Sequence, residues 1–138
     1  MRIFVSEDSP EIRKRLVAML RTVRGVSVVG EAESVGAAIA GVLSTASDVL
    51  LLDLQLADGS GLDVLSGLKT QRPALRVIVL TNFATAQHRQ ASLAAGADVF
   101  LDKSQEFQRV PGILRGWLDL PQTGSPDPGQ SADSTSKE

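Results

Sequence analysis

Five short apolar runs, each followed by a longer stretch of helical periodicity, occupy the first 118 residues of the chain. The runs lie at residues 3–5, 26–29, 49–52, 77–80 and 99–101 and are rich in Val, Ile and Leu. Strands that are apolar on both faces are typical of a parallel sheet covered by helices. Consecutive strand–helix pairs make right-handed crossovers, so we expect a doubly wound α/β fold. It should be a flavodoxin-like three-layer sandwich with five helices and a five-stranded parallel sheet of order 2-1-3-4-5.

The stretches between the runs predict the helices with unequal clarity. The first carries one apolar stripe, which consists of Ile12, Leu16, Met19, Leu20 and Val23. Its arginines lie mostly on a solvated face. The second, at about residues 34–44, is weakly marked because Ala and Gly predominate in it. Ser60 suits the start of the third, and Gly96 suits the residue after the fourth, which should span about residues 85–95. Pro111 must lie in the first turn of the fifth helix, which should begin near Gln108.

Composition changes abruptly near Leu120. Residues 121–138 are rich in Pro, Gly and Ser and contain no large apolar side chain. Such a segment cannot bury enough surface to offset the entropy of ordering it. We therefore expect one folded domain over residues 1–120 and a disordered acidic tail over residues 121–138.

Charge and cysteine content exclude several classes of function. The net charge of −2 lacks the positive excess that phosphate-backbone contacts require, so we expect no direct nucleic-acid binding. The chain has no cysteine, which excludes disulfides, thiolate zinc sites and cysteine nucleophiles. No run of 18 apolar residues and no signal-like N-terminus occurs, so we expect a cytoplasmic protein without membrane contacts.

Residues that can carry chemistry follow the predicted strands. In a doubly wound sheet, ligands bind beyond the carboxyl ends of the strands. Clustered carboxylates repel one another unless a cation is present, and oxygen ligands suit Mg²⁺. A lysine and a threonine suit the oxygens of a phosphoryl group. The pattern predicts Mg²⁺-assisted phosphoryl transfer, with the carboxylate after the third strand as nucleophile, from five residues: Glu7, Asp8, Asp53, Thr81 and Lys103.

In order and spacing, these five residues make positions 1–118 resemble a response regulator receiver domain, the phosphoacceptor of two-component signalling. Phe100, three residues before the lysine, matches the family's aromatic switch position. Residues 58–63 and 95–98 resemble the family's turns into the third helix and the fifth strand. The resemblance implies a phosphorelay in which a sensor histidine kinase or a histidine phosphotransfer protein phosphorylates Asp53.

The resemblance also implies roles for the metal ligands and the phosphate-binding groups. Asp8, Asp53 and the backbone carbonyl of Gln55 would bind Mg²⁺, and Glu7 would act mostly through metal-bound water. Lys103 and the hydroxyl of Thr81, the switch residue of the family, would hold the phosphate oxygens.

The resemblance implies that signalling shifts the population between two conformations that the domain already adopts. Movement of Thr81 would make room for Phe100 to turn inward. The surface of the fourth helix, the fifth strand and the fifth helix would then change. A downstream protein target would bind that surface, which is also a candidate homodimer interface.

Three positions depart from the family pattern. Ser104 follows the lysine where many receivers have proline, so we expect no cis peptide bond there. Asn82 is bulkier than the small residue usual in the family and should narrow access to Asp53 or hydrogen-bond the phosphate. Phe83 occupies a position that tunes attack by water in receivers, and we hypothesise that its bulk slows self-hydrolysis.

Three functions remain to be compared. The first is a standalone phosphoacceptor that acts through protein contacts and is a signalling domain rather than an ordinary enzyme. The second is a small Mg²⁺-dependent phosphatase, although such enzymes carry an Asp-x-Asp nucleophile after the first strand, and here that strand ends in Glu-Asp. The third is a degenerate receiver that serves as a scaffold, which the complete set of five residues disfavours.

Overall fold

The computed structural model of this chain describes residues 1–120, so the predicted tail at 121–138 lies outside the described residues. The main sheet has five parallel strands in the order β2-β1-β3-β6-β7. Their bounds are Arg2–Ser6 for β1, Ser27–Ala32 for β2, Val49–Leu52 for β3, Arg76–Thr81 for β6 and Val99–Asp102 for β7. Numbered along the main sheet alone, this is the predicted order 2-1-3-4-5, and the predicted fold class is confirmed.

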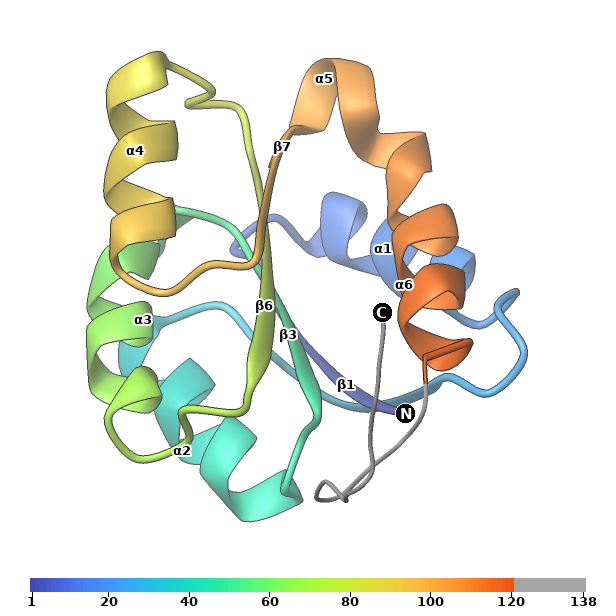
Figure 1. Cartoon of the computed structure of the whole chain (residues 1–138). Helices are drawn as coiled ribbons and strands as arrows, with labels where there is room; N and C mark the ends of the chain where they lie inside the picture. Colours follow the sequence, from blue (N-terminus) through green and yellow to red (C-terminus); the bar gives the residue numbers. More distant parts are fainter. Residues whose placement is uncertain (121–138) are drawn as a thin grey trace, which may run out of the picture.

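Helices cover both faces of this sheet, as Figure 1 shows. One layer holds α2 (Val35–Thr45), α3 (Gly61–Lys69) and α4 (Ala86–Ala94), and the other holds α1 (Pro10–Leu20) and α6 (Val110–Leu118). Alternate residues of the buried strands enter separate cores: Leu50 and Leu52 face α2 and α3, whereas Leu51 faces the layer of α1 and α6. This two-sided burial explains the continuous apolar runs in the sequence.

Helix α2 has a weak amphipathic pattern because small residues let it approach the sheet closely. The Phe4 ring of β1 fills the space beside Gly30 and Gly41, where an added Cβ would lie 2.5 Å from the ring atom Cε2 in each case. Real Cβ atoms essentially never come that close. The aromatic ring therefore supplies the apolar bulk that the helix lacks.

Caps account for the helix boundaries, and those at Ser60 and Gly96 confirm the predicted positions. The Ser9 hydroxyl accepts a hydrogen bond from Ile12 N at the start of α1, and the Ser60 hydroxyl accepts one from Leu62 N at the start of α3. Gly96, after α4, adopts a φ of 111°, the left-handed conformation that favours glycine.

Two features were not predicted. A two-stranded antiparallel ribbon, β4 (Gln55–Leu56) and β5 (Gly59–Ser60), follows the third main strand. The fifth helical stretch begins earlier than expected, with α5 (Lys103–Glu106) and a 3₁₀ turn, η1 (Phe107–Arg109), ahead of α6.

A cap explains the early start of this helical stretch. The Asp102 carboxylate accepts hydrogen bonds from the backbone N–H of Ser104 at 2.9 Å and from its hydroxyl at 2.7 Å. A proline at position 104 would have no N–H to donate. No cis peptide bond occurs between residues 1 and 120, as expected from the serine. None of the helices in this part of the chain is long and apolar enough to cross a membrane.

Candidate functional site

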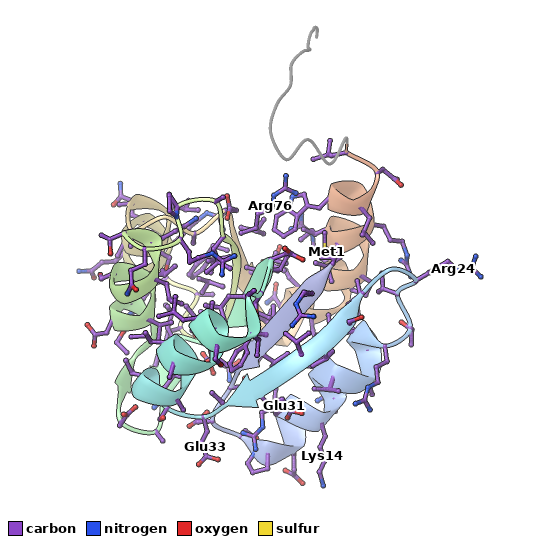
Figure 2. All side chains as sticks on the ribbon, turned by 90° about the horizontal axis from the view of Figure 1, so that it is seen from below. Met1, Lys14, Arg24, Glu31, Glu33 and Arg76 are labelled. Atoms are coloured by element: carbon purple, nitrogen blue, oxygen red, sulfur yellow. The ribbon has the colours of Figure 1, made fainter. Side chains whose placement is uncertain are left out.

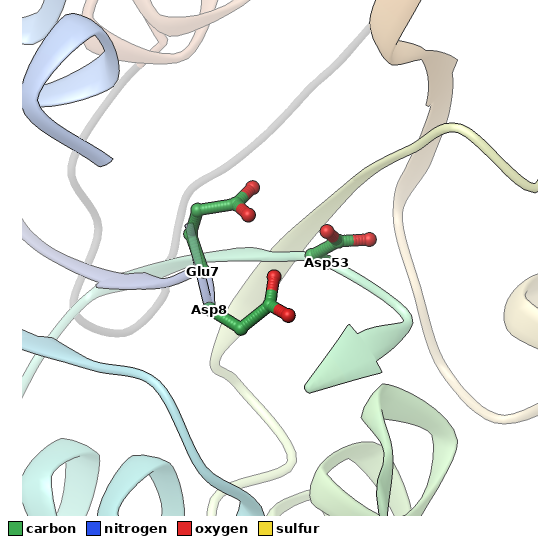
Figure 3. Close-up of side chains that lie close together, drawn as sticks. All are labelled: Glu7, Asp8 and Asp53. Atoms are coloured by element: carbon green, nitrogen blue, oxygen red, sulfur yellow. The ribbon is translucent and has the colours of Figure 1, made fainter. Parts of the chain in front are cut away.

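The carboxylates of the site meet because the strands that carry them are neighbours in the sheet. Strand β1 ends at Ser6 and pairs with β3, so that Ser6 lies opposite Leu52. Asp53, the residue that follows β3, donates its backbone N–H to the Ser6 carbonyl at 3.0 Å. Glu7 and Asp8 directly follow Ser6, and all three acidic side chains therefore lie over the same edge of the sheet (Figure 3).

These three carboxylates form a compact cluster of oxygen donors. One oxygen from each of Glu7, Asp8 and Asp53 lies within 4.8 Å of the others. Glu7 and Asp53 are buried, and Asp8 is the most exposed of the three. A few carboxylates that leave room for water and phosphate oxygens are the ligands that Mg²⁺ prefers, so the donor set fits this ion.

Lys103 brings the balancing charge into the cluster from the far end of the chain. Its Nζ lies 2.7 Å from Glu7 Oε1 and 2.7 Å from Asp53 Oδ2. Its side chain is 9% exposed, and those of the two carboxylates are 2% and 6% exposed. A buried carboxylate needs such a partner because the loss of hydration otherwise destabilises its ionised form.

Burial and pairing shift the pKa values of two of these groups. Burial raises the pKa of the Glu7 carboxyl above 4.5, although hydrogen bonds from Lys103 and from Ser9 N act in the opposite direction. Burial lowers the pKa of Lys103, but its hydrogen bonds to Asp53 and Glu7 outweigh this effect and leave the pKa above 10.5. Lys103 is therefore a firmly protonated cation at neutral pH.

The backbone around Asp53 is held in place by its neighbours. Gln55 donates its N–H to Asp53 Oδ1 at 3.2 Å, and Gly61 donates its N–H to the Leu54 carbonyl at 2.8 Å. An added Cβ on Gly61 would lie 2.4 Å from the Asp53 carbonyl oxygen, so only glycine fits there without displacement. The first residue of α3 thus packs directly on the backbone of the proposed nucleophile.

The two proposed switch residues occupy neighbouring strands. Thr81 ends β6, is buried, and accepts a hydrogen bond from Phe83 N at 3.2 Å through its hydroxyl. Phe100 lies in β7, opposite Val79, and is 4% exposed within the core beside α4. The Arg89 guanidinium lies 5.6 Å from the centre of the Phe100 ring, and its Nη1 lies 3.3 Å from the Phe100 carbonyl oxygen.

A hollow of about 290 Å³ is lined in part by Leu54 and Gln55, the two residues that follow Asp53. It lies between the β4–β5 ribbon and the residues that lead into α4, and its lining includes Leu54, Gln55 and Phe83. The Phe83 ring is 43% exposed and packs on the His88 ring with 5.8 Å between the centres.

The structure thus brings Glu7, Asp8, Asp53 and Lys103 into one cluster and places Thr81 at the end of the next strand. Sequence reasoning missed one residue that contacts this cluster. Arg13, read as part of a solvated helix face, donates from Nη1 to the Glu7 carbonyl oxygen at 2.7 Å. Helical periodicity could not reveal this contact, because it distinguishes polar from apolar faces and not one polar partner from another.

Comparison with known proteins agrees with the architecture. A family model described as "Response regulator receiver domain" matches residues 3–115. The DNA-binding transcriptional activator DevR/DosR of Mycobacterium tuberculosis is 33% identical over 103 residues, which cover 75% of this chain and 48% of that protein. The probable transcriptional regulatory protein TcrX of the same organism is 34% identical over 118 residues, or 84% of this chain and 49% of TcrX. The chain spans about half the length of these two curated relatives.

Solved structures of receiver domains also superpose on this chain. The isolated REC domain of RcsB from Salmonella enterica serovar Typhimurium superposes with a TM-score of 0.79 at 25% identity, covering 86% of this chain and 88% of that one. The signal receiver domain of the putative response regulator NarL from Mycobacterium tuberculosis superposes with a TM-score of 0.76 at 28% identity, covering 86% and 97%.

Proposed function

We propose that this chain, which belongs to the family of response regulator receiver domains, accepts a phosphoryl group on Asp53. The donor in this proposal is the phosphohistidine of a sensor histidine kinase or of a histidine phosphotransfer protein, and the cofactor is Mg²⁺. One observation carries the assignment: the Lys103 ammonium lies 2.7 Å from both Glu7 and Asp53, within the three-carboxylate cluster.

Each side chain has a role that its position supports. Asp53 is the nucleophile, because its carboxylate is buried and held at both oxygens, by Gln55 N and by Lys103. Lys103 would transfer its hydrogen bonds to the incoming phosphoryl oxygens, and the Thr81 hydroxyl would donate its own hydrogen to one of them. Asp8, Asp53 and the Gln55 carbonyl would hold Mg²⁺ directly and Glu7 mostly through water, and the ion would offset the negative charge of the phosphoryl group.

The output of the domain, in this proposal, is a change in protein contacts. Thr81 and Phe100 form the switch, and the surface of α4, β7 and α6 binds a downstream protein target or a second copy of the chain. We propose that residues 1–120 act as a cytoplasmic receiver that makes no direct nucleic-acid contacts of its own. The DNA-binding name of DevR/DosR describes a protein about twice as long as the stretch that matches here.

The function can be tested with a small phosphodonor. The chain is incubated with Mg²⁺ and acetyl phosphate, and intact mass spectrometry is used to look for an adduct of one phosphate that is stable in acid and labile in base. Wild type should form the adduct, and Asp53→Asn should not. Asp63→Asn is the matched control, because Asp63 is an exposed carboxylate in α3 and should leave the adduct unchanged.

The same assay separates the alternatives. Turnover of a free phosphomonoester without a trapped adduct would favour the small Mg²⁺-dependent phosphatase. No adduct and no Mg²⁺ binding would favour the degenerate receiver that serves as a scaffold.

A further inference from the structure

The Arg13 side chain is more buried than its place on a polar helix face suggests. Its side chain is only 18% exposed, and its guanidinium contacts the loop that joins β1 to α1. Nη1 donates to the backbone carbonyl of Glu7 at 2.7 Å, and Nε donates to Glu31 Oε1 at 3.2 Å. Nη1 also lies 3.9 Å from Glu33 Oε2. One side chain therefore connects α1, the acidic loop and the end of β2.

The hydrogen bond from Arg13 to the Glu7 carbonyl affects the positions of two acidic residues of the proposed metal site, Glu7 and Asp8. The Glu7 carbonyl belongs to the peptide unit that leads into Asp8, so its direction sets where the Asp8 side chain leaves the backbone. The other groups of Glu7 are also held: its N–H donates to the Ala32 carbonyl at 2.9 Å, and its carboxylate accepts from Ser9 N at 3.1 Å. Arg13 is the side chain that completes this set of restraints.

Glu31 and Glu33 hold the guanidinium from the other side. Both lie at the carboxyl end of β2, as Figure 2 shows, and they are more exposed than Arg13, at 44% and 60%. Exposed ion pairs contribute little stability by themselves. Here they orient a planar group with several fixed donors, so that one donor is directed at the Glu7 carbonyl.

We propose that Arg13 is a positioning residue for Mg²⁺ binding, which it supports by orienting the peptide between Glu7 and Asp8. The inference rests on the metal site of the proposed function and adds a residue to it. Two explanations for the presence of Arg13 predict opposite changes in Mg²⁺ affinity when the side chain is removed. If only charge mattered, removing a cation near three carboxylates would strengthen the attraction of the site for Mg²⁺. If orientation matters, removing Arg13 weakens Mg²⁺ binding.

The test is a calorimetric titration of the full chain with Mg²⁺, without a phosphodonor. In Arg13→Gln, the Kd for Mg²⁺ should rise about ten-fold, because loss of a group that orients metal ligands commonly costs about that much affinity. Lys14→Gln is the matched control, since it removes one positive charge from the same turn of α1 at an exposed position (Figure 2). The control should bind Mg²⁺ as tightly as wild type or slightly more tightly.

Two further variants keep the test decisive if Arg13→Gln folds poorly. Arg13→Lys retains a donor for the carbonyl and should restore part of the affinity. The double variant Glu31→Gln, Glu33→Gln leaves Arg13 in place but removes the charges that orient it, and it should weaken Mg²⁺ binding by a smaller factor.

The outcomes separate this inference from the proposed function. Wild-type binding together with unchanged or tighter binding by Arg13→Gln would overturn the positioning role and leave the phosphoacceptor site intact. Equal weakening in the Lys14→Gln control would also overturn it. A wild-type chain that binds no Mg²⁺ would refute the metal site itself, and this inference with it.

Discussion

Gly61 offers the sharpest test of how the fold positions Asp53, the proposed nucleophile. In Gly61→Ala, the new Cβ would lie 2.4 Å from the Asp53 carbonyl oxygen, whereas ordinary van der Waals contact begins at 3.4 Å. The difference means that α3 and the Asp53 backbone must separate by about 1 Å, while the hydrogen bond from Gly61 N to the Leu54 carbonyl resists their separation. Overpacking of this kind typically costs about 1–3 kcal/mol. A misplacement of about 1 Å at a reacting group can cost about 10²-fold in rate.

Two measurements on the same variant separate stability from chemistry. The free energy of unfolding comes from denaturant titration, and the rate of adduct formation with acetyl phosphate comes from intact mass spectrometry. Gly36→Ala is the control, because Gly36 lies near the start of α2 with no heavy atom within 4 Å of an added Cβ. It should gain up to about 1 kcal/mol from helix propensity and retain the wild-type rate. A Gly61→Ala variant that is phosphorylated at the wild-type rate would refute the argument that this glycine positions Asp53.

Three other substitutions test separate parts of the molecule. Phe83→Ala should shorten the lifetime of the acyl phosphate, because it widens the hollow lined by Leu54 and Gln55, the residues that follow Asp53, and an unchanged lifetime would contradict this role. Arg89→Met should cost about 0.5–1 kcal/mol and shift the signal of Phe100 in ¹⁹F NMR of fluorophenylalanine-labelled protein, since the cation over that ring is removed. An unshifted signal would show that Arg89 does not restrain the ring. Hydrogen bonds from Asp102 N and the Arg109 guanidinium lower the pKa of Glu106 below 4.5. A lowered carboxyl pKa adds stability above the unfolded-state value that is lost as the pH falls through the folded-state value. The advantage of wild type over Glu106→Gln in unfolding experiments should therefore be present at pH 7 and disappear in acid. An advantage that persists at pH 2 would contradict the charge argument.

The fold was predictable because burial leaves a local signature in the sequence. A run such as residues 49–52 must be apolar on both faces, and Ser9 and Ser60 precede helices because their hydroxyls accept the first free N–H groups. The β4–β5 ribbon had no such signature, since each of its strands has only two residues. The early start of the last helical stretch depends on a cap from Asp102 to Ser104 that apolar periodicity does not register.

The site was predictable to the extent that sheet topology brings strand ends together. Glu7, Asp8, Asp53 and Lys103 were expected to meet because each follows a parallel strand, and the structure places them in one cluster. Arg13 was not identified, because its partners are a backbone carbonyl and two glutamates remote in sequence, one in β2 and one just after it.

The sequence by itself determined which residues follow the strands and therefore which charges share one edge of the sheet, since apolar periodicity and strand order depend on local pattern. Only the tertiary structure decided the pairings within that edge: Lys103 between Glu7 and Asp53, and Gly61 against the Asp53 backbone. Both pairings depend on packing distances between segments remote in the chain. Such distances are set by the close packing of the whole core, and no local pattern encodes them.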